Sequence, residues 1–219
     1  GRVGSSDQKQ INILYEANKV AKDYFKETLR QDQGKQAIEY LKKRGLSGET
    51  AAEFEIGFAP DSPDALHRHL IGLGYQIAAV EKAGLVFKTD RGTYVDRFRN
   101  RIMFPILNHF GKPIGFTGRI MPGFEADNVG KYINSPETPI FNKSKILYGF
   151  DKSKNAIRES KTAVLVEGQM DFVMAWQDGV KNLAATSGTA LTAEHMKTLR
   201  RVAESLVLSF DQDEAGQLA

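Results

Sequence analysis

The chain of 219 residues contains no cysteine. Disulfide bonds, thiolate zinc sites and a cysteine nucleophile are therefore excluded within it, and such a composition is typical of a reducing compartment. The chain also lacks any apolar run approaching the roughly 20 residues that span a bilayer, so we expect no membrane segment. No signal peptide and no internal repeat is visible. The polar residues 1–6 are interpreted as a possible tag remnant.

A strong overall charge is lacking too, because 30 basic and 27 acidic residues give a formal net charge of only +3. The charge is unevenly distributed, however. Residues 1–90 are neutral overall, residues 91–160 carry a net charge of +6, and residues 161–219 carry −3. A basic block beside an acidic block suggests a polyanion site next to a cation site.

Apolar residues at helical spacing dominate the first part of the chain. They predict helices over residues 7–30, 33–44, 48–54 and 76–82, and another that begins at the Ser62-Pro63 pair and runs to Ile71. The period then changes to that of strands. These are predicted over residues 84–88, 93–96, 101–107 and 113–120, with a hairpin turn at residues 108–112.

The last part of the chain alternates strands with helices. After a helix at residues 152–160, apolar strands are predicted at 162–166, 182–185 and 205–210, with helices at 169–177 and 192–203 between them. This order predicts a parallel sheet whose strands are buried on both faces. The fold class is therefore α/β, with an α+β N-terminal subdomain over residues 7–155 and a parallel-sheet subdomain with flanking helices over residues 156–219.

Acidic residues follow two strands of the predicted parallel sheet. Glu167 comes directly after the first strand, with Asp171 shortly beyond it, and Asp211 and Asp213 follow the third. Ligands of parallel sheets bind at the carboxyl ends of the strands, and carboxylate oxygens are the ligands that Mg²⁺ prefers. Either these carboxylates converge on divalent cations, or they are solvated and cap the next helix. The pattern alone leaves both interpretations open.

Basic residues alternate along one predicted extended segment. Arg97, Arg99 and Arg101 are two residues apart, so on a strand they would share one face, which suits contact with phosphate groups. The alternative is a solvated strand face without a ligand. Further basic residues follow at strand ends and in loops, at Arg119, Lys131, Lys143 and Lys145.

Three other features have less specific interpretations. The segment Ser187–Thr189 follows a strand and offers backbone N–H groups to a phosphate, or is an ordinary turn between strand and helix. His195 is predicted on a surface helix with a structural role. Trp176, the only tryptophan, is predicted to lie in the core.

The acidic pattern, with Glu167-Gly168 and Asp171 followed by Asp211 and Asp213, resembles the signature of the Toprim domain of primases, topoisomerases and some nucleases. The segments upstream narrow the resemblance to the bacterial replicative DNA primase family. They occur in the family's order and are YLKKRGLS (40–47), FEIGFAP (54–60), DRFRNRIMFPI (96–106), IGFTGR (114–119), KYINSPET (131–138) and ILYGF (146–150). Together they cover about residues 10–219.

The resemblance implies RNA primer synthesis on single-stranded DNA by metal-dependent nucleotidyl transfer. It implies Mg²⁺ or Mn²⁺ as cofactor, with Glu167, Asp211 and Asp213 as catalytic metal ligands and Asp171 nearby. A basic ridge is implied to guide the template and bind ribonucleoside triphosphates, at Arg97, Arg99, Arg119, Lys131, Asn134 and Lys143. A replicative helicase as partner and a location in the bacterial cytoplasm, at the replication fork, also follow from the resemblance.

The chain departs from the family pattern at its end. It stops at Ala219, shortly after Asp213, whereas the family continues into a further acidic motif of Asp-Pro-Asp type. We therefore expect a core fragment of a larger protein with an incomplete Toprim subdomain, and the sequence leaves open whether this fragment is active alone. Two alternatives remain: a non-catalytic module that binds single-stranded DNA or nucleotides, and another Toprim-type phosphodiester enzyme such as a nuclease.

Overall fold

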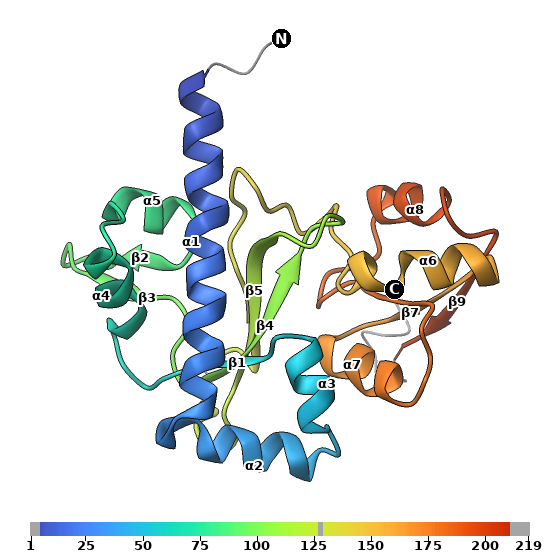
Figure 1. The fold of residues 1–219 in the computed structure, drawn as a ribbon, viewed down its shortest axis with the longest axis horizontal. Coiled ribbons are helices and arrows are strands. Elements are labelled where there is room, and N and C mark those ends of the chain that lie inside the picture. Colours follow the sequence, from blue (N-terminus) through green and yellow to red (C-terminus); the bar gives the residue numbers. More distant parts are fainter. Residues whose placement is uncertain (1–4, 127–128, 211–219) are drawn as a thin grey trace.

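The computed structural model describes residues 5–126 and 129–210. One long helix, α1 (Ser5–Arg30), crosses in front of an antiparallel sheet, and a parallel sheet lies beside it (Figure 1). The buried residues Leu14, Ala17, Ala21 and Phe25 of α1 recur at helical spacing, so one face of the helix packs on the sheet. The predicted helix over residues 7–30 is confirmed.

The other helices of the first part are short: η1 (Asp32–Gly34), α2 (Lys35–Lys43), α3 (Gly48–Glu53), α4 (Ala65–Gly72) and α5 (Ile77–Lys82). The predicted helix over 33–44 is thus divided into η1 and α2. Helix α4 begins at Ala65 and not at the predicted Pro63. The N–H groups of its second and third residues, Leu66 and His67, donate to the carboxylate of Asp96 at 2.8 and 2.9 Å, so a side chain from another element caps the helix.

The antiparallel sheet has the strand order β1 (Gly57–Ala59), β4 (Arg101–Leu107), β5 (Pro113–Ile120) and β6 (Tyr132–Asn134). Strands β4 and β5 agree with the prediction and are joined by the predicted hairpin turn. The three-residue strands β1 and β6 were not predicted. Strands β2 (Val86–Lys88) and β3 (Tyr94–Asp96) form a separate hairpin beside α4 and α5 (Figure 1).

The last part of the chain runs through α6 (Phe150–Ser160), β7 (Thr162–Val166), α7 (Gln169–Gln177), β8 (Leu183–Ala185), α8 (Ala193–Leu199) and β9 (Ser205–Ser209). The strands are parallel in the order β8-β7-β9, as predicted. Burial on both faces is wrong for β9, where Val207 and Leu208 are 49% and 52% exposed. Within the described residues, Leu206 is the one side chain of β9 that packs against a hydrophobic cluster.

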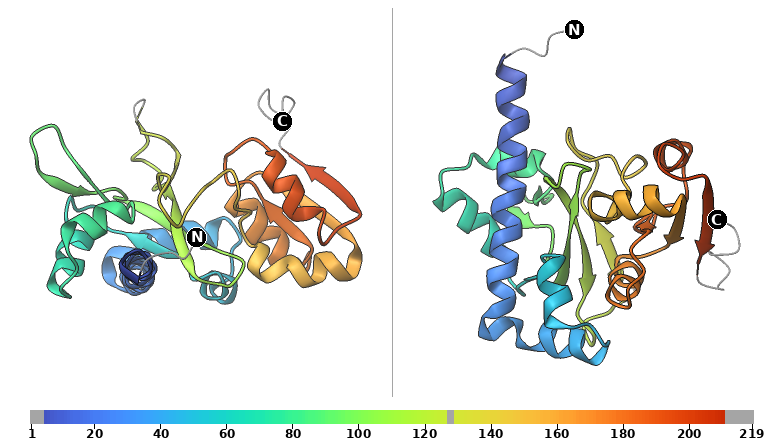
Figure 2. Two further views of the ribbon diagram at one scale, coloured as in Figure 1. Left: turned by 90° about the horizontal axis from the view of Figure 1, so that it is seen from above. Right: turned by 45° about the vertical axis from the view of Figure 1, so that its right-hand side comes forward.

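A shared core joins the two sheets. Phe54, at the end of α3, packs edge-on against Phe172 and Trp176 of α7, with ring centroids 5.7 and 5.5 Å apart. The same cluster extends to Phe104 of β4, and Trp176 is buried as predicted. Seen from above, α6 lies on one side of the molecule, while the loop after β5 and the end of β9 lie on the opposite side (Figure 2). Within the described ranges, no helix is both long and apolar enough to cross a membrane.

Candidate functional site

The carboxyl ends of β7 and β8 bring the first predicted acidic residues into one region. Glu167 follows β7 directly and is half-buried, and its carbonyl oxygen accepts the N–H groups of Ser187 and Gly188 at 3.0 and 3.4 Å. Asp171, in the first turn of α7, is exposed, and its Oδ2 accepts the N–H of Gly168 at 3.2 Å. Glu167 and Asp171 therefore both lie just beyond the end of β7.

These residues fit a hard divalent cation by donor type, because Mg²⁺ and Mn²⁺ prefer carboxylate oxygens. Asp211 and Asp213, the other two predicted ligands, lie outside the described residues. Over residues 5–126 and 129–210, no three carboxylate or imidazole side chains come together as a metal site. Glu167 and Asp171 are thus the described part of the predicted ligand set.

The turn after β8 contains two consecutive left-handed residues, Ser187 (φ 62°) and Gly188 (φ 72°). Their N–H groups already donate to the Glu167 carbonyl, which favours an ordinary turn over a phosphate-binding loop. A non-glycine residue with positive φ is strained, so other contacts must hold Ser187 in place. One of them is a hydrogen bond from Asn134 Nδ2 of β6 to the Ser187 carbonyl oxygen, at 2.9 Å.

A chain of side-chain hydrogen bonds crosses from the parallel sheet to the antiparallel sheet. Gln169 Nε2 of α7 donates to Thr117 Oγ1 of β5 at 2.6 Å, and that hydroxyl donates to Asn134 Oδ1 at 2.6 Å. Asn134 then reaches Ser187. Gln169 and Thr117 are buried, so these bonds are protected from water. An amide nitrogen has two donors, which leaves Asn134 one further N–H for a ligand.

Arg119 lies on β5 next to this connection, and its side chain is only 5% exposed. Its guanidinium stands 4.4 Å from the centroid of the Tyr40 ring, and Nη1 donates to the carbonyl oxygen of Ile120 at 2.6 Å. The Nε atom is buried and has no hydrogen-bond partner among the described residues. A buried donor without a partner is rare in a folded protein, so this N–H is a candidate donor to a water molecule or to a ligand oxygen.

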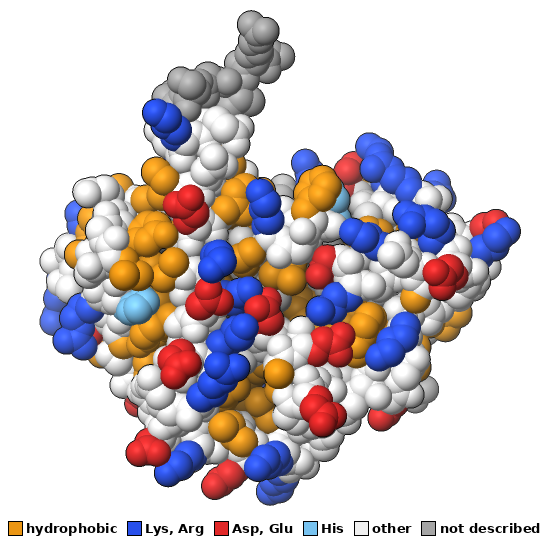
Figure 3. Space-filling view, in the orientation of Figure 1, with side chains coloured by type: hydrophobic (Ala, Val, Ile, Leu, Met, Phe, Trp, Pro, Cys, Tyr) orange, Lys and Arg blue, Asp and Glu red, His pale blue; other side chains and the backbone are white. Residues whose placement is uncertain are grey.

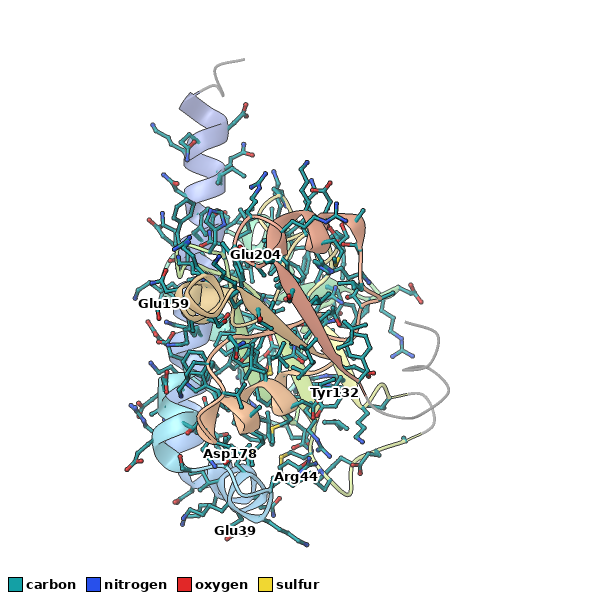
Figure 4. The ribbon with its side chains drawn as sticks, turned by 90° about the vertical axis from the view of Figure 1, so that its right-hand side faces the viewer. Glu39, Arg44, Tyr132, Glu159, Asp178 and Glu204 are labelled. Atoms are coloured by element: carbon teal, nitrogen blue, oxygen red, sulfur yellow. The ribbon has the colours of Figure 1, made fainter. Side chains whose placement is uncertain are left out.

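Tyr132, on β6, is influenced electrostatically both by Asp171 of α7 and by Arg119 of β5. Burial raises the pKa of Tyr132; Arg119 and Arg44 lower it, while Asp171 raises it, so these charged groups act on the same phenol. In Figure 4 the strands of the parallel sheet run from the side of Glu159 and Glu204 toward the side on which Tyr132 lies. The hydroxyl of Tyr40 accepts a hydrogen bond from Arg44 at 3.1 Å.

The predicted strand face of Arg97, Arg99 and Arg101 is wrong. Strand β3 ends at Asp96 and β4 begins at Arg101, and between them Asn100 adopts φ 50°, which breaks the extended geometry. The three arginines nevertheless line one surface cavity of about 310 Å³, together with Phe124 and Val129 of the loop after β5.

The three arginines differ in their surroundings. Arg97 donates from Nε to the Gly84 carbonyl at 3.1 Å, and burial lowers its pKa. Arg101 is buried and donates from Nη1 to the carbonyl oxygens of Gly118 and Gly130, both at 3.0 Å, so it fixes the base of the loop. Arg99 is exposed. Of the three arginines predicted to bind a nucleotide or DNA, namely Arg97, Arg99 and Arg119, Arg99 is the most exposed.

Lys131 and Lys143 are exposed. Lys131 acts together with Arg119 on Glu125, whose pKa is lowered first by the backbone N–H groups of Glu125 and Gly123 and then by these two cations. The carbonyl oxygen of Lys143 accepts a hydrogen bond from His195 Nε2 at 3.1 Å. His195 is fully buried, so its predicted position on a helix surface is wrong; burial lowers the pKa of its imidazole.

Four residues of this region were not predicted as site residues: Tyr40, Thr117, Tyr132 and Gln169. Each is an uncharged side chain, and the sequence reasoning searched for charge. Three of them lie in the segments 40–47, 114–119 and 131–138 that carry the resemblance, which is the one signal that pointed toward them. Gln169 lies between Glu167 and Asp171, and only the packing of α7 on β5 gives it a role.

Comparison with known proteins identifies two matching families. A family described as DNA primase catalytic core, N-terminal domain, matches residues 24–154, and one described as Toprim-like matches residues 164–219. Among curated proteins, a DNA primase of Geobacillus stearothermophilus is 41% identical over 214 residues, which is 97% of this chain and 35% of that protein. The chain thus spans about a third of the length of the curated relatives it matches.

Solved structures give the same result. The RNA polymerase domain of Mycobacterium tuberculosis primase DnaG superposes with a TM-score of 0.86 at 35% identity, covering 94% of this chain and 68% of that one. A DnaG primase catalytic domain bound to single-stranded DNA superposes with a TM-score of 0.87 at 36% identity, covering 97% and 65%. The α/β fold of this chain is therefore similar to that of these catalytic cores.

Proposed function

The chain belongs to the DNA primase family, and from this premise we propose that the protein containing it synthesises RNA primers on single-stranded DNA. The substrates are ribonucleoside triphosphates, and the reaction is nucleotidyl transfer with release of pyrophosphate. The observation that supports this most is the hydrogen-bonded connection from Gln169 through Thr117 and Asn134 to Ser187. It joins the acidic edge, by which we mean Glu167 and Asp171 after β7, to β5, the strand that carries Arg119.

Glu167 and Asp171, with Asp211 and Asp213, are proposed to hold Mg²⁺ or Mn²⁺. When bound, such ions stabilise the attacking and leaving oxygens of the transfer. Arg119 is proposed to donate its unpartnered Nε to a triphosphate oxygen, because a fixed donor costs no reorganisation when charge develops. Asn134 orients the turn that follows β8 and keeps one N–H for the nucleotide.

The exposed basic residues are proposed to guide the template strand. Arg97 and Arg99 line one cavity with the loop after β5, and Lys131 lies where that loop returns to β6. Lys143 extends the basic surface toward α8. Contacts of this kind neutralise phosphates, so template affinity should fall with salt concentration. We infer for the whole protein a bacterial cytoplasmic location at the replication fork and a replicative helicase as partner.

Primer synthesis by the full-length protein tests this function. We expect Glu167→Gln to lower the yield of oligoribonucleotides on a single-stranded template by at least about 100-fold, because it removes one metal ligand. Glu204→Gln is the matched control: Glu204 lies at the amino end of β9 and pairs with Lys161 on the surface. Equal synthesis by the Glu167 and Glu204 variants would contradict the proposal.

Template binding separates an enzyme from a module that only binds. Fluorescence anisotropy with labelled single-stranded DNA should show weaker binding for Arg99→Gln and Lys131→Gln, and unchanged binding for Glu167→Gln. If wild-type protein binds the strand but makes no oligoribonucleotide with Mg²⁺ or Mn²⁺, the non-catalytic alternative is correct. Cleavage of the strand instead would identify a nuclease.

A further inference from the structure

A second basic cavity lies on the face opposite the candidate site. It has a volume of about 540 Å³ and lies between the tip of the β4–β5 hairpin, the segment before α6, and the helices α6 and α8. Four cations line it: Lys145, Lys154, Arg158 and Arg201. Figure 3 shows Lys and Arg side chains gathered over α6 and α8 on this face. Glu167 and Asp171 are not among the residues that line the cavity.

The four cations have no carboxylate partner within residues 5–126 and 129–210. Among the ion pairs of the described residues, none involves Lys145, Lys154, Arg158 or Arg201. Glu194 is the single acidic residue in the described lining, and its carboxylate is shared with Lys197 at 3.9 Å. Four cations gathered around a concave surface with a single carboxylate in its described lining repel one another and attract an anion.

A hydrogen bond between two elements holds one wall of the cavity in place. Lys154 Nζ donates to the carbonyl oxygen of His109 at 2.7 Å, so α6 is tied to the hairpin that forms one wall. Lys154 keeps two N–H donors for a ligand. The floor is apolar, because the buried Leu147 and the half-buried Ile146, Phe150 and Val202 also line the cavity.

We propose that this cavity binds a nucleotide, with its phosphate groups on the four cations and its base over the apolar floor. The volume lies within the roughly 300–1,000 Å³ that is usual for small-molecule sites. The four cations lie around a single cavity, which favours a small ligand. Proteins that bind a nucleic-acid strand instead place their basic residues along an extended groove. The proposal does not depend on the catalytic function, since it uses none of the residues assigned to it.

Isothermal titration calorimetry of the full-length protein with ATP in the presence of EDTA tests the site. Because EDTA chelates divalent ions, it removes metal-dependent binding of ATP at the proposed metal ligands. We expect one metal-independent binding event. The double variant Arg158→Gln and Arg201→Gln should weaken it by about tenfold or more, since two charge-assisted contacts are lost. Arg200→Gln is the control, because Arg200 lies beside Arg201, is exposed and is not part of the lining. Circular dichroism of each variant verifies folding.

Three results would overturn the proposal. The first is no binding of ATP by wild-type protein in EDTA. The second is equal binding by the double variant and by Arg200→Gln. The third is loss of affinity for labelled single-stranded DNA in the double variant without any change in ATP binding, which would make the cavity part of a nucleic-acid surface.

Discussion

Arg119 is a buried cation whose environment selects a guanidinium over an ammonium. The planar group stacks on Tyr40 and donates to Ile120, and its buried Nε has no hydrogen-bond partner in the part of the chain that the structure describes. A lysine keeps the charge but has neither the plane nor the fixed fork of donors. The sequence predicted the residue, because its type and its segment were visible, but it did not predict the burial, which depends on Tyr40 from a distant helix.

Arg119→Lys should therefore weaken nucleotide binding by about tenfold or more, measured as the KM for ribonucleoside triphosphates in primer synthesis. Arg44→Lys is the matched control, because Arg44 bonds to the same Tyr40 from an exposed position. If both variants raise the KM equally, the stacked guanidinium has no special role.

Asp96 gives a pH-dependent contribution to stability. Burial raises its pKa to about 6 from 3.8, and the N–H groups of Leu66 and His67 offset this only in part. Between these two values the folded state binds more protons than the unfolded state, so this group makes the protein less stable as the pH rises from 4.5 to 7.5.

Asp96→Asn removes this titrating group. When the pH is lowered from 7.5 to 4.5, the unfolding free energy of the wild type should therefore rise by about 2 kcal/mol relative to that of Asp96→Asn. Urea denaturation at the two pH values measures it. If the unfolding free energy of the wild type relative to Asp96→Asn is the same at both pH values, or is higher at pH 7.5, the pKa of Asp96 is not raised in the folded protein.

Helix α1 approaches the antiparallel sheet so closely that one strand position must be glycine. A Cβ on Gly57 of β1 would lie 2.6 Å from the backbone carbon of Phe25. Gly57→Ala should therefore destabilise the protein by roughly 1–3 kcal/mol, because helix and strand must separate. Thermal or urea unfolding measures the loss.

Gly72→Ala is the control for this prediction. Gly72 ends α4 and has open space around its Cβ position, so alanine there should leave stability unchanged or raise it by up to about 1 kcal/mol. Comparable losses in both variants would mean that close packing at Gly57 is not the cause.

The elements with long apolar patterns were predicted best. Strands β4, β5 and β7 and helix α7 have the predicted bounds, since burial and local period agree in them. Strands β1 and β6 were not predicted, because they form by pairing with β4 and β5, and no local pattern in their own residues contains that pairing. The start of α4 depends on Asp96, which is distant in the sequence. The break at Asn100 depends on the packing of the neighbouring strands. No local sequence pattern contains either contact.

At the scale of the whole molecule, the two sheets are joined by a polar contact within an apolar core. Thr117 accepts from Gln169 and donates to Asn134, so removing its hydroxyl takes a partner from the buried Gln169 amide and from the half-buried Asn134 amide. Thr117→Val and Gln169→Met should each destabilise the protein by about 1–3 kcal/mol.

The double variant should lose about 1 kcal/mol less than the sum of the single variants, because the two side chains share one bond. Strict additivity would show that the bond between the sheets contributes nothing. The charge blocks of the sequence predicted that a basic and an acidic region would meet, but the residues that hold them together are uncharged, so charge patterning did not reveal them.

The central claim is that the acidic edge after β7 and the buried Arg119 of β5 form one site for metal and nucleotide. Crystals of the protein soaked with Mn²⁺ and a non-hydrolysable ribonucleoside triphosphate, with anomalous data collected for manganese, test it directly. We predict an anomalous peak at the Glu167 carboxylate and a triphosphate oxygen within hydrogen-bond distance of Arg119 Nε. A manganese peak away from Glu167, or a triphosphate that does not contact Arg119, would contradict it.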